Sequence, residues 1–430
     1  MSKQIKKNKK RPFGLFLFLI LLSGMQSKTY RSITVSNIEI EGNTKTKDFV
    51  IKREIRHPIN ILIDTLNIND DLNRLENLGI FSDVSWNLIY LDDSTAILKY
   101  NIQESIQQTP PTIFPTYNEN KGWSLSTLWF RNNFRGRNQL LSLSGSIGAE
   151  DTYGISFNDP WLFDNHISLF STISRNLYQH RFLGYDVDLN KLKFGFGKWF
   201  SDDIKTSISF SFERKEFSNE SDVIKVFKYL NVNSIIKYDT RDIYWNPGKG
   251  VLINHSFIYT EGNSINNLTW HQSYSMYFGI KRFKRKSVLA FNGSLEQKYG
   301  YENKFWQNYI GNSYTVRGWE LPDNKIYKEE PYRFGHEFFH GSIEYRYEII
   351  PKHITKYSIE SGLAIVLFKD FGSMLYNLSL LNDKQILHGS GIGIRIPFPL
   401  IGVIRIDFGI GSYNGYSNSG IFHFGIGQKF

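Results

Sequence analysis

Along most of the chain after residue 110, apolar and polar residues alternate with a period of two. The runs 204–212 and 404–410 place isoleucine, phenylalanine or threonine at every second position. This period gives each segment one apolar and one polar face, which predicts β-strands. The polar face is largely serine and glycine, and aromatic residues gather near the strand ends. These features predict a transmembrane β-barrel, because only a closed sheet satisfies its backbone hydrogen bonds in lipid.

The alternation predicts sixteen antiparallel strands within residues 110–430, an even number that keeps both ends of the barrel's chain on the same side of a membrane. Their ranges are 111–118, 122–131, 138–148, 152–159, 166–176, 188–199, 203–213, 224–239, 250–260, 267–280, 286–299, 337–349, 357–371, 387–396, 401–411 and 420–430. The longest connection, about 300–336, follows the eleventh strand and contains Arg317. By this count the connection begins on the outer side of the membrane.

Residues 33–104 predict a small α+β domain with the element order β-α-α-β-β. A first helix is expected between Thr46, its capping residue, and Arg56, and a second runs from about Thr65 to Leu78. This order, together with the stretch 77–84, resembles a POTRA domain. Such domains are periplasmic modules that pair an exposed sheet edge with extended client segments. The alternative is a generic α+β domain with the same order. The fold class is therefore mainly β, with a barrel preceded by this domain.

The N-terminal segment 1–27 carries no acidic residue; its six cations all precede an apolar run at 13–22. This pattern predicts a secretory signal peptide. The alternative is a membrane anchor, but the apolar run is too short to span ~30 Å of hydrocarbon. Without this segment the formal net charge falls from +10 to +4, which weakens a nucleic-acid interpretation. The chain has no cysteine, which excludes disulfides and thiol catalysis.

The stretch 313–323 places Arg317 between Val316 and Gly318 in an otherwise apolar, glycine-containing loop. The phase of two neighbouring strands turns Glu344 and Asp370 toward the inside of the barrel. A guanidinium can bridge carboxylates with two hydrogen bonds and does not lose its proton. The sequence therefore predicts that the loop folds into the barrel and docks there through Arg317. The alternative is that Arg317 is an ordinary exposed loop cation.

Several motifs resemble those of the outer-membrane barrel assembly and translocation superfamily, the BamA- and TamA-like bacterial surface antigen family. Val316-Arg317-Gly318-Trp319 resembles its Val-Arg-Gly-aromatic loop motif, and Phe368-x-Asp370-x-Gly372 is similar to the strand motif to which that arginine pairs. Glu344 matches the second acidic partner. The further matches are 133–138, 158–161, 239–242, 246–250 and 425–430. The resemblance covers roughly residues 33–430 and implies that these loop and strand residues lock the loop inside the barrel.

The barrel is predicted to close along a weak seam between its first and last strands. The first strand contains two prolines, which donate no backbone hydrogen bond, and the last contains several glycines. The residues expected at this seam are Pro111, Pro115, Gly420, Gly425, Gly427 and Phe430. A weak seam exposes strand edges that can template an incoming strand.

The resemblance implies a factor for outer-membrane protein assembly and insertion that opens laterally at this seam. It implies a location in the outer membrane, with the POTRA domain in the periplasm. The implied partners are unfolded outer-membrane or secreted client polypeptides, outer-membrane lipid and periplasmic or lipoprotein accessory subunits, but no nucleic acid. The alternatives are a two-partner polypeptide-secretion pore and an accessory translocation and assembly module. BamA-like proteins carry several POTRA domains and two-partner transporters two, whereas this sequence has room for one, which leaves these alternatives open.

No enzymatic activity is predicted. Histidines such as His336, His340 and His423 are present, but no nucleophile motif frames any serine. No metal-ligand spacing stands out among the ten histidines, so neither a metal nor a cofactor is expected.

Overall fold

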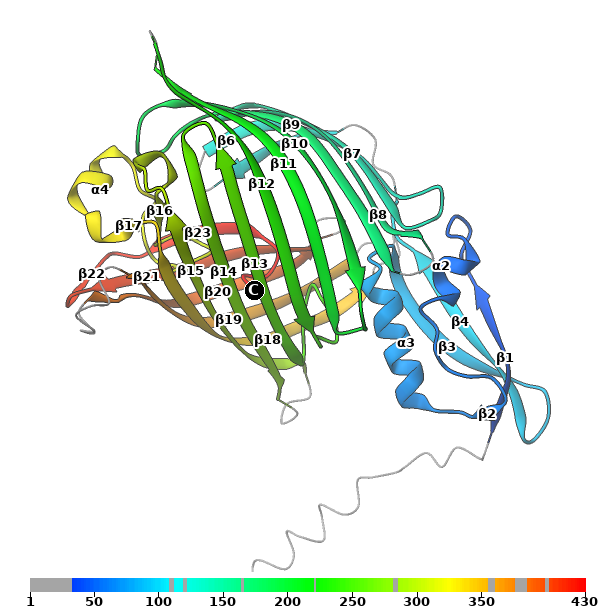
Figure 1. Ribbon diagram of the computed structural model, residues 1–430. Coiled ribbons are helices and arrows are strands. Elements are labelled where there is room, and N and C mark those ends of the chain that lie inside the picture. Colours follow the sequence, from blue (N-terminus) through cyan, green and yellow to red (C-terminus); the bar gives the residue numbers. More distant parts are fainter. Residues whose placement is uncertain are drawn as a thin grey trace, which may run out of the picture.

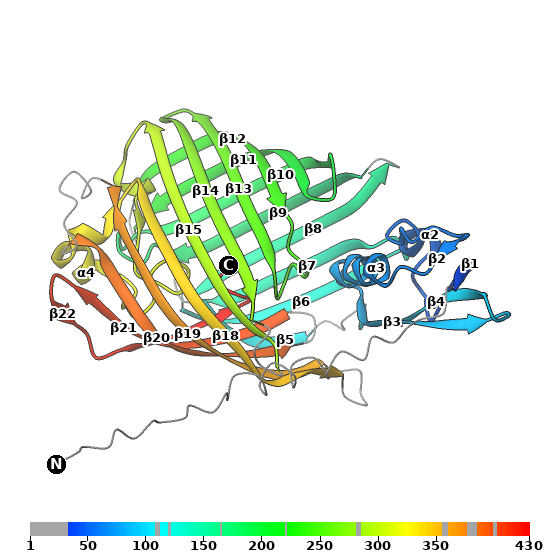
Figure 2. The same ribbon diagram turned by 90° about the horizontal axis from the view of Figure 1, so that it is seen from below.

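The computed structural model of the protein describes residues 33–107, 112–118, 122–163, 166–219, 222–280, 285–354, 360–375, 385–398 and 402–430. The predicted signal segment 1–27 and Pro111 lie outside these residues. A small α+β domain precedes a large antiparallel β-sheet that is wound into a barrel (Figures 1 and 2). Within the described ranges, no helix is both long and apolar enough to cross a membrane.

The N-terminal domain has the predicted order, with one additional short strand. Its elements are β1 (Thr34–Glu41), α2 (Asp48–Lys52), β2 (Ile61–Leu62), α3 (Thr65–Asn77), β3 (Phe81–Tyr90) and β4 (Thr95–Glu104). The strands form one sheet in the order β2-β1-β4-β3, in which β1 runs parallel to β4. Strand β3 therefore forms one edge of the sheet.

The apolar faces of the two helices form the core of this domain against the sheet. Val50, Ile51, Ile68 and Leu75 are fully buried and pack together with residues of β1 and β4. The carboxylate of Asp64 caps α3 by accepting a hydrogen bond from the backbone N–H of Leu66. The spacing of apolar residues three and four apart explains why α3 forms at this position.

The prediction that Thr46 caps the first helix is wrong. Lys47 occupies the capping position of α2 and makes no side-chain capping bond. The hydroxyl of Thr46 instead donates to the carboxylate of Glu104 at 2.6 Å. Thr46 therefore ties the loop before α2 to the end of β4.

Within the described residues the barrel contains sixteen strands, as predicted. They are β5 (Thr112–Asn118), β6 (Gly122–Phe134), β7 (Gln139–Gly148), β8 (Glu150–Phe163), β9 (Ile167–Gln179), β10 (Asp186–Trp199), β11 (Ile204–Ser218), β12 (Val223–Asp239), β13 (Gly250–Gly262), β14 (Ile265–Gly279), β15 (Ser287–Gly300), β18 (Phe338–Ile354), β19 (Glu360–Met374), β20 (Leu387–Phe398), β21 (Gly402–Tyr413), and β22 (Tyr416–Ser417) with β23 (Ile421–Ile426). Because β22 and β23 both pair with β21, they count as one strand.

Strand order in the barrel follows chain order, and the barrel closes with β23 next to β5. Antiparallel register partners join each consecutive pair from β5 to β15, then β15 to β18, and onward to β21 and β23. Within the described residues, no register partners are assigned between β5 and β23. We call the barrel end beside the N-terminal domain the proximal end and the opposite one the distal end.

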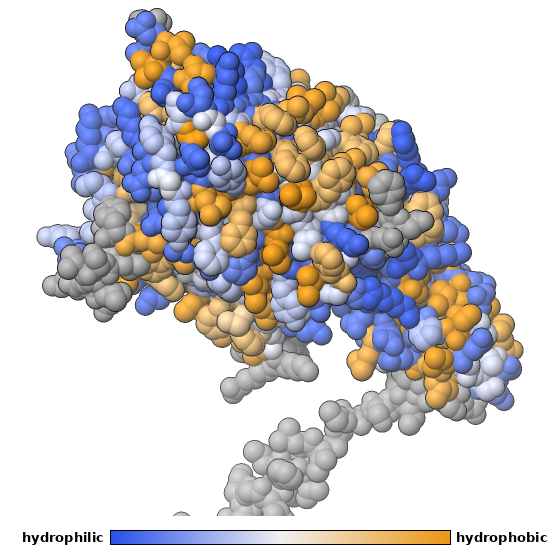
Figure 3. Space-filling model, in the orientation of Figure 1, coloured by the Kyte–Doolittle hydropathy of each residue, from blue (hydrophilic) through white to orange (hydrophobic). Residues whose placement is uncertain are grey.

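An apolar band crosses the outside of the barrel wall from β8 to β12. Ile155, Ile173, Leu192, Phe212 and Leu230 lie side by side as register partners on five neighbouring strands. The first four are exposed, and Figure 3 shows hydrophobic residues gathered over this part of the wall. The residues directly before and after each of these five in the sequence face inward and are mostly polar. The period-two pattern of the sequence therefore translates directly into the two faces of the wall.

The last strand is shorter than predicted. It was expected to run over 420–430, but β23 ends at Ile426, and Gly427 turns the chain with a φ of +84°. The positive φ explains the end of the strand, since it is a conformation that glycine adopts readily. Phe430 packs inside the barrel beside Tyr277 on β14, with ring centroids 6.2 Å apart. Phe430 is therefore not a seam residue in this structure, contrary to the prediction.

The N-terminal domain contacts several turns at the proximal end of the barrel (Figure 2). Helix α3, the loop before α2 and the segment after α2 take part. The contacts are Lys47 N–H to Gly136 O at 2.9 Å, Asn133 Nδ2 to Thr46 Oγ1 at 2.8 Å, the Arg56–Asp202 ion pair, Tyr244 N–H to Asn77 Oδ1 at 3.0 Å, and Lys352 Nζ to Glu76 Oε1 at 3.3 Å. They tie the domain to barrel turns that are far apart in sequence.

Glu104 is expected to make the loop at 44–46 sensitive to acid. Burial alone would raise the pKa of Glu104, but hydrogen bonds from Thr46, Thr44 and the N–H of Lys45 together lower it below 4.5. Stability from this carboxylate is therefore present above the unfolded pKa and is lost as pH falls through the folded one. Backbone hydrogen exchange of peptide 42–49, corrected for intrinsic rates, should lose protection as pH falls below 4.5.

Glu104→Gln should leave this peptide poorly protected even at neutral pH. Glu41→Gln is the matched control, because Glu41 also ends a strand of this sheet but pairs with Lys99 instead. Equal protection of 42–49 in the wild type and Glu104→Gln at all pH values would contradict the assignment.

Candidate functional site

The long loop 301–337 folds back into the barrel from its distal end. It contains η1 (Lys304–Trp306), β16 (Asn308–Tyr309), α4 (Asn324–Glu329), η2 (Pro331–Arg333) and β17 (Phe334–Gly335). The two short strands β16 and β17 pair with each other and hold the two sides of the loop together at its base. The segment 310–320, between β16 and α4, forms the loop tip.

Internal hydrogen bonds hold the loop tip in shape. The fully buried Arg333 donates to the carbonyl oxygens of Ile310 at 3.1 Å and Glu320 at 2.6 Å. The side chain of Asn312 accepts hydrogen bonds from the backbone N–H groups of Tyr314 and Thr315, both at 2.9 Å. The tip is thus preorganised before any contact with the wall is counted.

Arg317 lies at the end of this tip and is completely buried. Its Nε and Nη2 donate to the two carboxylate oxygens of Asp370 at 2.7 and 2.9 Å, and its backbone N–H donates to the same carboxylate at 3.0 Å. Nη1 lies 2.8 Å from Oε1 of Glu344 and 3.0 Å from Oδ2 of Asp407. The guanidinium also stacks over the ring of Phe368 at 3.6 Å. One guanidinium thus contacts carboxylates from β18, β19 and β21.

The structure places the predicted loop and strand residues at one site, and it adds partners that the sequence reasoning did not select. Asp407 faces inward in the alternating pattern of β21, but nothing in the pattern brought β21 close to Arg317. His423, on β23, accepts a hydrogen bond from the N–H of Gly318 at 2.8 Å. Lys429 lies 2.8 Å from Asp370 and donates to the carbonyl oxygen of Thr315 at 2.6 Å.

Apolar contacts surround the charged centre. Val316 is fully buried and packs with Ile310, Met374 and Leu387. The indole N–H of Trp319 donates to the carbonyl oxygen of His388 at 3.0 Å. These contacts exclude water from the Arg317 ion pairs, which strengthens each of them.

Inward glycines on β20 and β21 allow the tip to lie directly on the wall. A Cβ at Gly389 would lie 1.9 Å from the carbonyl oxygen of Arg317, and one at Gly411 would lie 2.5 Å from that of Gly318. Gly318 itself has a φ of +90°, and a Cβ there would lie 2.7 Å from the N atom of Gly411. Gly372 is also predicted at this site, and a Cβ added there would lie 3.0 Å from Cγ2 of Val316. The backbone of the loop tip therefore packs directly against the backbone of β20 and β21.

The buried cluster around Arg317 contains more cations than carboxylates. The buried cations are Arg317, Arg346, Arg395, Arg405 and Lys429, and the buried carboxylates are Glu344, Asp370 and Asp407. Arg395 pairs with Asp407 at 2.5 Å, and Nε of Arg405 lies 3.6 Å from the same carboxylate. The formal charge of these eight groups is +2.

The remaining predicted seam residues lie along β5 and near β23. Pro115 is exposed on β5. A Cβ at Gly425 would lie 2.7 Å from Nη2 of Arg405, and one at Gly420 would lie 2.5 Å from the ring of Phe408. These glycines therefore accommodate side chains of β21, a packing role that the sequence reasoning did not foresee. In the part of the chain that the structure describes, no group of three metal-ligating side chains is arranged to hold a metal ion.

Comparison with known families agrees with this architecture. The profile of the Omp85 superfamily domain matches residues 133–430, which include most of the barrel and the whole docked loop. The chain belongs to the Omp85 superfamily. A second profile, for POTRA, described as a surface antigen variable number repeat, matches residues 33–105 of this Omp85 chain. The resemblance noted in the sequence is thereby confirmed.

Curated relatives match part of this Omp85 chain. Outer membrane protein assembly factor BamA of Neorickettsia risticii (strain Illinois) is 28% identical over 152 residues, which are 35% of this chain and 20% of that protein. BamA of Neisseria meningitidis serogroup B is 27% identical over 141 residues, which are 32% of this chain and 18% of that protein. The matches span about a fifth of the length of these relatives.

Solved structures share the fold over nearly the whole chain. BamA from Haemophilus ducreyi lacking POTRA domains 1–3 has a TM-score of 0.53 at 17% identity and covers 93% of this chain and 84% of that one. CdiB from Acinetobacter baumannii has a TM-score of 0.57 at 15% identity, and the match covers 92% of this chain and 74% of that one. At these identities the likeness concerns the Omp85 fold alone.

Proposed function

We propose that this protein is an outer-membrane protein assembly and insertion factor whose barrel opens laterally between β5 and β23. Its POTRA domain would lie in the periplasm and bind unfolded client polypeptides, which then fold into the membrane at the opened seam. Lipid of the outer membrane and accessory subunits are the further partners of this proposal. Its curated relatives carry the name of outer membrane protein assembly factor.

The observation that carries the proposal is the shortness of β23 at the junction. β23 has six residues, whereas its neighbour β21 has twelve. Pro115 also removes a backbone donor from β5. Fewer residues offer fewer ladder hydrogen bonds, so this junction should separate at a lower cost than others.

The edge strand β3 supports the client-binding part of the proposal. It is ten residues long, and it pairs with β4 on one side only in the sheet order of the domain. A long unpaired edge offers backbone donors and acceptors to an extended segment, as in strand addition generally. Clients would thus be recognised by backbone rather than by a fixed side-chain sequence.

A polypeptide-secretion pore is the second candidate, and the docked loop disfavours it. The tip of 301–337 lies inside the lumen, held by three carboxylates. A pore would have to release this loop before a chain could pass. An accessory translocation and assembly module would keep the lateral mechanism but act on fewer clients.

Disulfide locking of the seam tests the proposal, and the absence of natural cysteines gives a clean background. One cysteine in β5, at Ile113, would be combined with cysteines scanned through β23 until oxidation links the two strands. The locked protein in liposomes should insert an unfolded eight-stranded barrel client at least about tenfold more slowly, and reduction should restore the rate.

The matched control locks Leu192 to Phe212, which are register partners on β10 and β11. This lock should leave the insertion rate unchanged. Full insertion activity with a locked seam would refute lateral opening. Continued passage of a secreted polypeptide through a locked barrel would favour the pore.

A further inference from the structure

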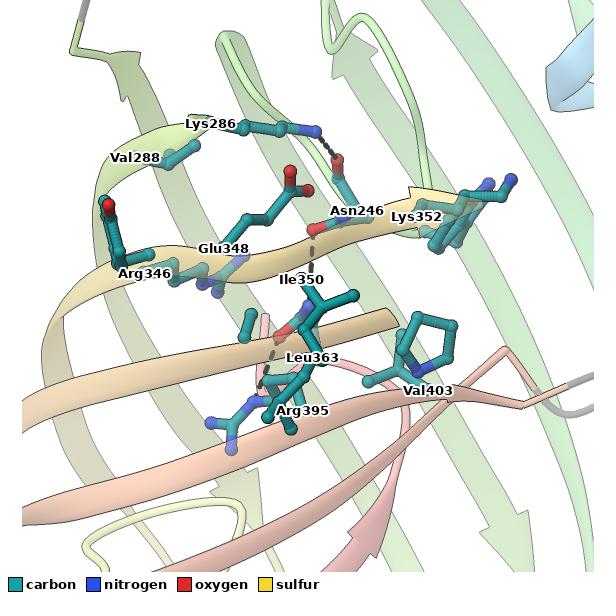
Figure 4. A pocket seen from close by; sticks show the side chains of 15 residues that line it. Asn246, Lys286, Val288, Arg346, Glu348, Ile350, Lys352, Leu363, Arg395 and Val403 are labelled. Carbon is teal, nitrogen blue, oxygen red and sulfur yellow. Dashed lines mark hydrogen bonds between the residues drawn. The ribbon is translucent and has the colours of Figure 1, made fainter. Parts of the chain in front are cut away.

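A small cavity lies inside the proximal end of the barrel, and Arg346 and Arg395 of the buried cluster line it (Figure 4). Its walls come from β15, β18, β19, β20 and β21, from the loop at 240–249 and from Gln428. The cavity volume is about 40 Å³, which suits a group of a few atoms rather than a peptide strand. The side of the cavity near Lys286 and Asn246 is contributed by proximal turns.

Cations dominate the charged groups of this cavity. The described lining residues include Lys286, Arg346, Lys352 and Arg395, against one carboxylate, that of Glu348. The structure shows Lys286 donating to the carbonyl oxygen of Asn246 at 3.0 Å, with the carboxylate of Glu348 beside it (Figure 4). Arg346, Arg395 and Lys352 also pair with carboxylates outside the lining, those of Glu344, Asp407 and Glu76. The lining itself still holds four cations and one carboxylate, which favours an anionic over a cationic occupant.

Arg346 supplies the most specific sign of a missing partner. Its side chain is only 6% exposed. Nε donates to Glu344 at 2.8 Å and Nη2 donates to the backbone oxygen of Phe430 at 3.3 Å. Nη1 is buried and has no hydrogen-bond partner among the described residues. A buried donor without an acceptor costs free energy, and an oxygen atom in the cavity would remove that cost.

Hydrogen bonds hold the polar rim in place. The side chain of Gln428 accepts from Nε of Arg395 at 3.2 Å and donates to Oδ1 of Asn246 at 3.3 Å. It therefore bridges β20 and the proximal loop across the cavity. A preorganised rim reduces the ordering cost of binding.

The rest of the wall is apolar. Val288, Leu363, Ala364 and Val403 line the cavity beside the cations. A fully hydrated ion such as phosphate would meet this wall unfavourably, whereas a carboxylate attached to an aliphatic carbon can contact both parts. We propose that the cavity binds one aliphatic carboxylate, held by Arg346 and Lys286. The carboxylate belongs to a small free acid or to an aspartate or glutamate side chain of a polypeptide at the proximal opening.

Thermal unfolding of the full chain in detergent tests this site, with sodium acetate replacing sodium chloride at constant ionic strength. Acetate should raise the Tm of the wild type in a saturable manner, because a ligand of the folded state stabilises it by mass action. Phosphate at the same ionic strength should raise it less. The site does not depend on the proposed function, since acetate binding needs neither client nor membrane.

Three variants make the test specific. Lys286→Gln should weaken acetate binding about threefold, because it removes a charge opposite to that of acetate. Glu348→Gln should strengthen acetate binding about threefold, because it removes a charge of the same sign. Arg175→Gln is the control, since Arg175 is an exposed cation paired with Asp188 on the outside of the barrel. Lys286→Gln and Glu348→Gln lie at the rim, so both proteins should fold. Opposite shifts in the two rim variants would not arise from a merely structural role.

The source of the carboxylate is distinguished by a second arm. A short peptide with one glutamate and its glutamine counterpart would be compared in the same assay. Saturable acetate binding identifies a site that accepts a free acid, and binding of the glutamate peptide alone identifies a polypeptide side chain; either supports the proposal. The same Tm response in all four proteins, or no response to acetate and peptide, would overturn it.

Discussion

Arg317→Met should release the loop tip from the barrel wall and destabilise the protein by about 3–5 kcal/mol, the usual cost of removing one partner from a buried ion pair. Methionine keeps much of the length and volume of arginine but leaves Asp370, Glu344 and Asp407 facing one another without the guanidinium. Each carboxylate keeps another buried cation, but the two side-chain hydrogen bonds to Asp370 and the contacts to Glu344 and Asp407 that join the loop tip to the wall are lost.

A cysteine at position 313 reports the release directly. Ser313 is fully buried in the docked tip, and the chain has no other cysteine. In the Ser313→Cys background, Arg317→Met should raise the rate of maleimide labelling by about two orders of magnitude, because labelling follows the population of the open form. Chemical unfolding gives the change in stability in parallel.

Lys325→Met is the matched control for Arg317→Met. Lys325 belongs to the same loop but forms an exposed pair with Glu329, and such pairs contribute about 0–1 kcal/mol. Its labelling rate and stability should match those of the Ser313→Cys parent. If Arg317→Met left position 313 as protected as in the parent, the guanidinium could not be what holds the loop.

Gly389→Ala should displace the same loop without touching a charge. The added Cβ would lie 1.9 Å from the backbone oxygen of Arg317, and backbone cannot rotate away as a flexible side chain can. The forced shift should cost about 1–3 kcal/mol and raise labelling at position 313. It should also lengthen the Arg317–Asp370 contacts, so Gly389→Ala combined with Arg317→Met should cost less than the sum of the two.

Gly293→Ala controls for the general effect of alanine in a barrel strand. Gly293 lies on β15, and a Cβ there would meet nothing within 4 Å. Its stability should stay within about 0.5 kcal/mol of the parent. Equal effects at 293 and 389 would mean that close approach of the loop backbone is not the cause.

The barrel was predictable because its rule is local. Every second residue faces lipid, so a run such as 204–212 reveals both the strand and its orientation without knowledge of its neighbours. The same phase turned Glu344 and Asp370 inward and made them candidates for Arg317. Motif resemblance then joined the loop to the strand, since periodicity alone gives no distance between them.

What the sequence could not supply depends on the curvature of the barrel. Asp407 and His423 also face inward, but their proximity to the loop tip follows from where β21 and β23 lie around the ring. The inward glycines of β20 were visible as an alternation, yet their meaning required the position of Arg317. The early end of the last strand depends on one positive φ at Gly427, which a period-two pattern does not reveal.

The spacing of the Arg317 contacts has a consequence for the order of folding. Asp370 lies 53 residues after Arg317 in the chain, Asp407 lies 90 residues after it, and His423 lies 105 residues after Gly318. Contacts across such separations form late, since long loops must close first. A nascent polypeptide that stops short of residue 407 would lack part of the acidic pocket for this arginine. Seating of the tip would therefore signal that synthesis and folding of the C-terminal strands are complete.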